Sequence, residues 1–324
     1  MAFANASYSD IIATTIQSRT RKIADNVTKN NALLTWLNKR GNSKPFSGGN
    51  VILQELNFAE NANAGWYSGY DLLPVAAQDV ISAAEFPIKQ AAVPVVISGL
   101  EMLQNAGKEQ MIDLMEGRMA VAEASMANLI SGALYSDGTG FGGKQLTGLN
   151  AAVPVVNTNT YGGIDANVWT FWRNYVDDNT AAELTPALIQ GFMNLAWSNL
   201  VRGVDRPDLI LMDSLVWQTY IASLQSQQRF TDPNSATLGF PTIKYMDADC
   251  VLDGGIGGFC PSGTMFFLNT KFIFFRPHSA RNMVPLAPNK RYAVNQDAEV
   301  QILAFAGNMT ASGRQFQGRI DFNG

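Results

Sequence analysis

The 324-residue sequence has few of the residues on which enzyme chemistry depends. Its one histidine is His278, so catalytic triads and histidine-based metal sites have almost no material. Three aspartates, Asp247, Asp249 and Asp253, lie close together, but their spacing fits no calcium loop and is typical of turns. We therefore expect no catalytic residue, no metal and no cofactor, and we predict that the protein is not an enzyme.

Signals for export and membrane insertion are also missing. No run of about 18 apolar residues occurs, and the first ten residues, MAFANASYSD, contain neither a basic nor an apolar stretch. We expect a protein that is neither exported nor embedded in a membrane. Cys250 and Cys260 are then expected to stay reduced and to serve as small core residues.

Charged residues are scarce and unevenly placed. They make up 15% of the chain, against roughly 25% in an ordinary soluble domain, while 47% of the residues are hydrophobic. This composition fits either a neutral monomer or a subunit whose surface is covered by copies of itself. Residues 1–47 carry a net charge of +5, which leaves −9 for the rest of a chain whose total is −4. Such a basic arm suits a nucleic acid, an acidic neighbouring subunit or a solvated helix face, and Arg19, Arg21 and Lys22 are its candidate contacts to a partner or DNA.

The first predicted elements are short helices and a long hairpin. Residues 8–40 carry apolar side chains at helical intervals, which predicts one or two amphipathic helices. The segment VILQELNF, from residue 51, alternates as a strand does, and residues 72–97 return as β-branched segments broken by three prolines. Together they predict an extended β-hairpin that reaches away from the body.

The predicted hairpin needs support that its own sequence does not supply, because an isolated two-stranded ribbon is marginally stable in water. A neighbouring copy of the chain is the expected support. The tip, AENANAGWYSGYD, contains Trp66, Tyr67 and Tyr70, and aromatic anchors dominate interface energies. We predict that these three residues form a contact between subunits.

A short helix that follows a capping box and is interrupted near Gly107 is predicted next, and then a long helix that ends near Tyr135. Residues Ser98–Glu101 have a capping-box pattern, and roughly twenty-eight residues at about 1.5 Å each would form a rod of about 42 Å. The glycine-rich segment DGTGFGGKQLTGL follows it. Residues 138–143 match a dinucleotide fingerprint in form, but that motif requires a strand before it and a helix after it. Because a helix precedes these glycines, nucleotide binding is disfavoured.

The remainder mixes helices and strands, so the predicted fold class is α+β. A helix begins at Thr185-Pro186, and the buried strand PDLILM at residues 207–212 leads into another helix. Further predicted strands are Thr242–Tyr245, Thr264–Leu268, Lys271–Arg276, Glu299–Ala306 and Arg314–Phe322, the last two on either side of an AGNMTASG turn.

This order of elements resembles the Hong Kong 97-type major capsid proteins of tailed double-stranded DNA bacteriophages, over nearly the whole chain. The most specific segments are the helix-end loop DGTGFGGKQLTGL, the strand–helix segment LILMDSLVW and the segment VQILAFAGNMTASGRQFQG. The resemblance implies an N-terminal arm at 1–47, an extended β-hairpin loop at 48–97, a peripheral domain with a spine helix at 98–179, an axial domain at 180–285, and return strands of the peripheral domain at 286–324.

The resemblance also implies a structural role. Copies are expected to form hexamers and pentamers of an icosahedral shell that encloses double-stranded DNA without sequence specificity, assembled in the host cytoplasm and found in the virion. No long charged helical segment opens the chain, so we expect a separate scaffolding protein. Decoration (cement) and portal proteins are further implied partners. Lys89 lies in the hairpin region, but nothing pairs it with an asparagine, and no crosslink is assigned.

Other interpretations remain at this point. An encapsulin-like protein compartment shares the fold and would hold protein cargo. A tail or surface-lattice protein would form tubes or sheets. An enzyme that uses residues 138–143 for a nucleotide is disfavoured by the preceding helix.

Overall fold

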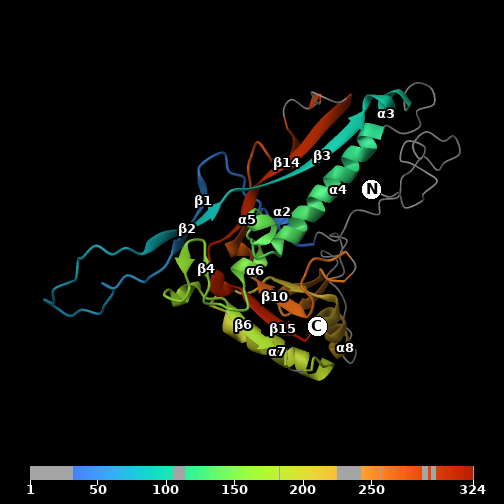
Figure 1. Ribbon diagram of the computed structural model, residues 1–324. Coiled ribbons are helices and arrows are strands. Elements are labelled where there is room, and N and C mark those ends of the chain that lie inside the picture. The colour runs from blue at the N-terminus through green and yellow to red at the C-terminus, as the bar shows by residue number, and fades with distance from the viewer. Residues whose placement is uncertain are drawn as a thin grey trace.

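A computed structural model describes residues 32–104, 114–181, 183–224, 242–255, 257–286, 291–292 and 297–323 (Figure 1). Arg19, Arg21 and Lys22 lie outside these residues. The helices are α2 (Ala32–Lys39), α3 (Gly99–Gln104), α4 (Leu114–Leu134), α5 (Gly140–Gly143), α6 (Leu149–Ala152), α7 (Pro186–Leu200) and α8 (Ser214–Leu224). The mixture of these helices with the strands below confirms the α+β fold class.

The strands form two larger sheets and two short ribbons. The hairpin strands are β1 (Val51–Asn57) and β2 (Ile81–Pro87). One sheet contains β3 (Lys89–Ser98), β11 (Ile273–Pro277), β12 (Val284–Pro285), β13 (Arg291–Tyr292) and β14 (Ala298–Ala311). The other contains β6 (Tyr175–Asn179), β7 (Leu209–Met212), β8 (Thr242–Tyr245), β9 (Ala248–Leu252), β10 (Thr264–Leu268) and β15 (Gly318–Phe322). A small ribbon pairs β4 (Thr160–Tyr161) with β5 (Ile164–Asp165).

The hairpin reaches away from the body of the molecule (Figure 1). Strands β1 and β2 are antiparallel, with Ile52 opposite Phe86, and both of these side chains are buried in the main core. Outside the paired strands, an amide hydrogen bond of 2.6 Å from Asn63 to the Ala76 carbonyl joins the two legs. The predicted loop covers residues 48–97, but the paired strands of the hairpin end at Pro87. The next strand, β3, pairs with β14 in the larger sheet.

The sheet built on β14 carries the long helix. Strand β3 runs antiparallel to β14, from Lys89 opposite Gly307 to Ser98 opposite Ala298. Helix α4 packs beside β3 (Figure 1). The predicted capping box is confirmed at the start of α3, since the Glu101 carboxylate accepts the Ser98 backbone N–H at 2.9 Å. The long helix ends at Leu134, next to the predicted Tyr135.

The six-stranded sheet has the order β6-β15-β10-β7-β9-β8. Its central strand β7 is buried on both faces, as its continuous apolar run LILM predicts. Ile210 and Met212 pack with α7 and α8, while Leu209 and Leu211 face the core that contains α2 and the end of α4. One strand thus joins the two hydrophobic clusters.

The turn predicted at AGNMTASG, between the last two strands, is wrong. Asn308 and Met309 lie in the expected turn, yet both are buried inside β14, which continues to Ala311 and pairs with β11. Strand β15 lies in the six-stranded sheet between β6 and β10, so residues 318–322 do not return to the sheet of β14. Strand β11, predicted within the axial segment, pairs with β14 instead.

The sequence around Asn308 is typical of a polar turn, but the fold supplies hydrogen-bond partners that allow this side chain to be buried in a strand. Its amide donates to the Pro87 carbonyl at 2.9 Å, and its side-chain oxygen accepts the Thr147 N–H at 2.9 Å. A buried polar group that is hydrogen-bonded in this way is compatible with a strand. Separately, no helix within the described residues is long and apolar enough to cross a membrane.

Candidate assembly interface

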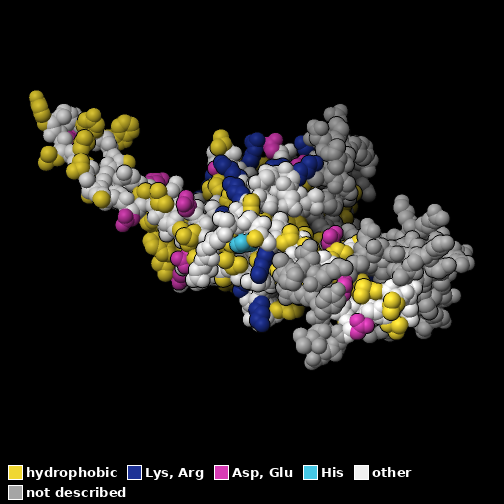
Figure 2. All heavy atoms as spheres, turned by 90° about the horizontal axis from the view of Figure 1, so that it is seen from above, with side chains coloured by type: hydrophobic (Ala, Val, Ile, Leu, Met, Phe, Trp, Pro, Cys, Tyr) yellow, Lys and Arg dark blue, Asp and Glu magenta, His cyan; other side chains and the backbone are white. Residues whose placement is uncertain are grey.

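The hairpin tip places its three aromatic residues in solvent. Trp66 and Tyr70 are fully exposed, and Tyr67 is 66% exposed. Leu72 and Val75, on the returning leg, are also more than 90% exposed. Hydrophobic side chains cluster at the far end of the projecting hairpin (Figure 2). Exposed apolar side chains gathered on one projecting segment mark a candidate interaction site, because their burial is favourable by roughly 25 cal/mol per Å².

Local hydrogen bonds shape the tip. The Asp71 carboxylate accepts the Ser68 backbone N–H at 2.8 Å, and the Asp71 N–H donates to the Ser68 carbonyl at 3.2 Å. This turn places Tyr70 at the bend. Residues 58–80 contain Glu60, Asp71 and Asp79 and no lysine or arginine, so the tip is both apolar and acidic.

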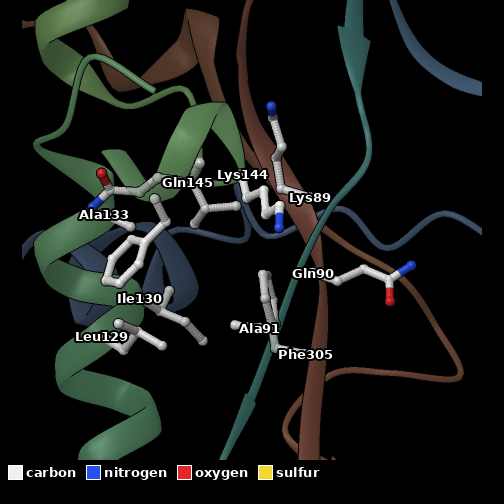
Figure 3. Close-up of a pocket in the computed structure, with 11 residues that line it drawn as sticks. Lys89, Gln90, Ala91, Leu129, Ile130, Ala133, Lys144, Gln145 and Phe305 are labelled. Atoms are coloured by element: carbon white, nitrogen blue, oxygen red, sulfur yellow. The ribbon is translucent and has the colours of Figure 1, made fainter. Parts of the chain in front are cut away.

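A groove lies between α4 and β3, close to the root of the hairpin. Its cavity volume is about 320 Å³. Helix α4 contributes Leu129 and Ile130 on one side and β3 contributes Ala91 on the other (Figure 3). Ile130 and Phe305 are fully buried beneath it, whereas Leu129 is 38% exposed. The groove is therefore apolar at its base.

The glycine-rich turn forms one wall of the groove. Phe141 lines it, is 75% exposed and has a backbone φ of 54°, which is uncommon for a residue with a side chain. The Lys89 ammonium donates to the Gly143 carbonyl and fastens this turn to β3. Lys144, which is exposed, also lines the groove. Two charged residues line the groove, and both are lysines, Lys89 and Lys144.

Within turn residues 138–143, Phe141 lines the groove. The turn does not have the strand-before, helix-after arrangement of a dinucleotide-binding loop. Helix α4 precedes these residues, and the short α5 lies within them. The Asp137 carboxylate accepts hydrogen bonds from the N–H and hydroxyl groups of Thr139, and these bonds lower the pKa of Asp137. A carboxylate at the start of the turn is unfavourable for an anionic ligand.

The three clustered aspartates do not converge. Asp247 forms a surface ion pair with Arg206 at 3.0 Å, while Asp253 is buried and accepts the Tyr135 hydroxyl at 2.5 Å. No group of three His, Cys, Asp or Glu side chains that could hold a metal occurs in the described part of the chain.

The described part of the basic arm contacts its own body. Arg40 pairs with Asp208 of the body at 2.5 Å, and it lies over the ring of Trp36, which belongs to the same arm, at 5.1 Å. Lys44 lies over the Phe274 ring at 4.5 Å. These contacts hold the end of the arm against acidic and aromatic groups of the same subunit.

The sequence placed the three aromatic residues on the projecting hairpin, where their contact with another subunit stays a prediction, and it gave no sign of the groove. The structure keeps Trp66, Tyr67 and Tyr70 on one projecting segment, as predicted. Phe141, Lys89 and Lys144 are brought together only by the packing of the glycine-rich turn on β3. The one available signal was a phenylalanine inside a glycine-rich turn, where a large apolar residue has no local packing partner.

No family model and no curated protein matches the sequence. Among solved structures, the chain is similar to the capsid protein of cyanophage A-1(L), with a TM-score of 0.70, 16% identity and coverage of 95% of this chain and 97% of that chain. The chain has the Hong Kong 97-type capsid fold. The capsid protein of a native GTA particle also matches, with a TM-score of 0.64, 12% identity and coverage of 99% and 100%.

An encapsulin also matches the structure. The SrpI encapsulin complex of Synechococcus elongatus PCC 7942 matches with a TM-score of 0.56, 8% identity and coverage of 97% of this chain and 95% of that chain. This TM-score is lower than those of the cyanophage A-1(L) and GTA capsids.

Proposed function

We propose that this chain is a major capsid protein whose copies close into an icosahedral shell around double-stranded DNA. The observation that carries the proposal is the exposed apolar tip of the hairpin, on a chain whose fold matches phage capsid subunits over nearly its full length. Trp66, Tyr67 and Tyr70 anchor the tip on a neighbouring subunit. This contact removes from water apolar surface that the subunit alone leaves exposed.

The geometry of the hairpin favours a ring. Each leg of about twelve residues between β1 and β2 spans up to roughly 40 Å at about 3.3 Å per residue. A compact chain of this length has a radius of gyration of about 20 Å, so the hairpin can cross much of a neighbour. A projecting segment that contacts a different surface on the next copy is a heterologous interface, which forms a ring when the rotation between copies closes and an open filament when it does not. Hexamers and pentamers are the rings of the proposed shell.

The proposed partners follow from the shell. Double-stranded DNA is packaged without sequence specificity, and Arg19, Arg21 and Lys22 of the basic arm contact DNA or a partner protein. A separate scaffolding protein guides assembly in the host cytoplasm, and portal and decoration proteins complete the virion. The protein's role is structural and non-enzymatic, so no residue is assigned a catalytic role.

A second candidate is an encapsulin-like compartment, which is favoured by the match to the SrpI encapsulin complex. Such a shell would enclose protein instead of DNA. A tail or surface-lattice protein is a third candidate, for which open tubes or sheets are the expected assemblies.

The content of purified particles tests the proposal. The protein is produced together with the other head proteins of its source, and its particles are treated with nuclease before extraction. Nuclease-resistant double-stranded DNA supports the capsid function. Particles that contain a protein cargo and no DNA support the compartment instead, and open tubes or sheets contradict both.

A further inference from the structure

Helix α2 is attached at both of its ends to carboxylates of other elements. The Leu33 N–H in its first turn acts on the Asp253 carboxylate, in the loop after β9, and lowers the pKa of that group. At its other end, Arg40 pairs with Asp208 at 2.5 Å and lies 3.7 Å from Asp249. Between these ends, α2 buries the apolar residues Ala32, Leu33, Leu34, Trp36 and Leu37. A helix of this length is unstable alone in water, so α2 depends on these attachments.

The two attachments differ in their exposure to water. The Arg40 side chain is 40% exposed, so its ion pair is screened and contributes little. Asp253 is buried, its Oδ2 accepts the Tyr135 hydroxyl, and its Oδ1 has no hydrogen-bond partner among the described residues. A buried carboxyl with an unpaired oxygen is costly when it is ionised and much less costly when it is protonated. The attachment at the start of α2 therefore depends on a proton.

The surroundings of Asp253 supply no cation to balance an ionised carboxylate. The titratable and charged groups around Asp253 and the adjoining thiol are Tyr135 after α4, Cys260 in the same loop, Asp213 at the start of α8, and Arg319 with Asp321 in β15. Arg319 is bound to Asp321, with its Nε 2.7 Å and 2.8 Å from the two carboxylate oxygens. Burial raises the pKa of the Cys260 thiol, which stays neutral. The basic residues of α2 itself lie at its other end.

We propose that α2, residues 32–39, is a strap whose attachment to the subunit is controlled by one proton on Asp253. With the proton in place, the strap packs against the end of α4 and the loop after β9, and loss of the proton favours its opening. The strap is the described part of the basic arm, so this proton determines how firmly the arm is tied to the body.

Acid favours the packed strap. Burial raises the pKa of Asp253 to about 7, whereas a carboxyl exposed by opening of the strap returns to its ordinary value of 3.8. The packed state holds the proton more tightly, so its advantage is complete below about pH 4 and is lost as pH rises through about 7. Between pH 5 and pH 8, the equilibrium constant for opening should increase about ten- to hundredfold, since each pKa unit is a factor of ten.

Hydrogen exchange of the unassembled, full-length subunit measures this opening. The Arg40 N–H donates to the Trp36 carbonyl at 3.1 Å, and the Asn42 N–H donates to the Leu37 carbonyl at 3.0 Å. Both amides report on the strap. After correction for the intrinsic pH dependence of exchange, their protection should fall about ten- to hundredfold from pH 5 to pH 8.

Helix α7 is the internal reference for global unfolding. Met193 and Ala196 are buried in its middle, so their amides exchange only when this part of the subunit opens. The strap amides should be less protected than these, because the strap opens while α7 stays folded. Equal protection of α2 and α7 at every pH would show that α2 opens only with the whole subunit, and it would overturn the proposal.

Two variants separate the proton from packing. Asp253→Asn removes the titration, so the protection of the strap should be the same at pH 5 and pH 8. Tyr135→Phe removes a hydroxyl that lowers the pKa of Asp253, so protection should begin to fall at a higher pH. A loss of packing alone would lower protection equally at all pH values. Asp247→Asn, at a surface ion pair, is the matched control and should keep the original profile.

The outcomes are independent of shell assembly. Strap protection that does not change with pH in the original protein overturns the proposal, and so does a pH midpoint that Y135F leaves in place. Y135F keeps this test available if D253N does not fold. Because the unassembled subunit is measured, either failure leaves the proposed shell function intact.

Discussion

Tyr135 donates a 2.5 Å hydrogen bond to the buried carboxylate of Asp253, joining the residue that follows α4 to the loop after β9. Burial raises the pKa of Asp253 to about 7, while the Tyr135 hydroxyl and the backbone N–H groups of Leu33 and Phe259 act in the opposite direction. The same carboxylate thus lies beside the start of α2 and the end of α4. At this point α2, the end of α4 and the loop after β9 meet.

Asp253→Asn should remove a pH dependence of subunit stability. Because the folded-state pKa lies above the ordinary value of 3.8, the native state holds this proton more tightly than the unfolded state does. The stabilising contribution is therefore complete below about pH 4, decreases as pH rises to about 7, and stays lost above that. Asparagine is neutral at every pH and can still accept the Tyr135 hydroxyl.

Urea unfolding of the unassembled subunit at pH 5 and pH 8 measures this effect. The variant's free energy of unfolding, relative to that of the original protein, should rise by about 1–4 kcal/mol between pH 5 and pH 8, since one pKa unit corresponds to about 1.4 kcal/mol. Asp247→Asn, at a surface ion pair, is the control, for which a shift well below 1 kcal/mol is expected. Parallel pH profiles for D253N and the original protein would contradict the assignment.

Replacing Trp66, Tyr67 and Tyr70 together with Ser should leave a folded subunit that assembles poorly. The three side chains are exposed, so their loss removes little from the subunit's own packing. Circular dichroism and thermal unfolding should match those of the original protein, while sedimentation shows few particles. Val204→Ser, at another exposed apolar residue, is the control and should assemble normally. Normal particle yields from the triple variant would rule out the tip as an assembly contact.

Asn308→Ala should destabilise the subunit by about 2 kcal/mol or more. The substitution leaves the Pro87 carbonyl and Thr147 without their buried partner and opens a cavity inside β14. Asn199→Ala, which removes an exposed amide that bonds Leu195, should cost well under 1 kcal/mol. Chemical denaturation measures both. Equal stabilities for the two variants would show that the Asn308 hydrogen bonds contribute little.

The sequence predicts those parts of the fold that local patterns determine. Thr185-Pro186 begins α7, the LILM run forms a buried strand, and Ser98 with Glu101 forms a capping box, each as expected. Local chemistry suffices in these places because the partners are close in sequence or the apolar run is long enough to be buried whatever it packs against.

Features that depend on distant partners escaped prediction. Asn308 looks like a turn residue until Pro87 and Thr147, more than 150 positions away, satisfy its amide. The groove likewise needs β3, α4 and the glycine-rich turn to pack together. Nothing in the local pattern around Asp253 indicates its burial against Tyr135, because the two residues are 118 positions apart.

The most direct test of the shell function is electron microscopy, with sedimentation, of the protein produced alone and together with the other head proteins of its source. The account predicts closed icosahedral particles, or isolated rings of five and six subunits that close into particles when a scaffolding protein is supplied. A monomer that stays monomeric in every combination, or one that forms only open tubes or sheets, would contradict it.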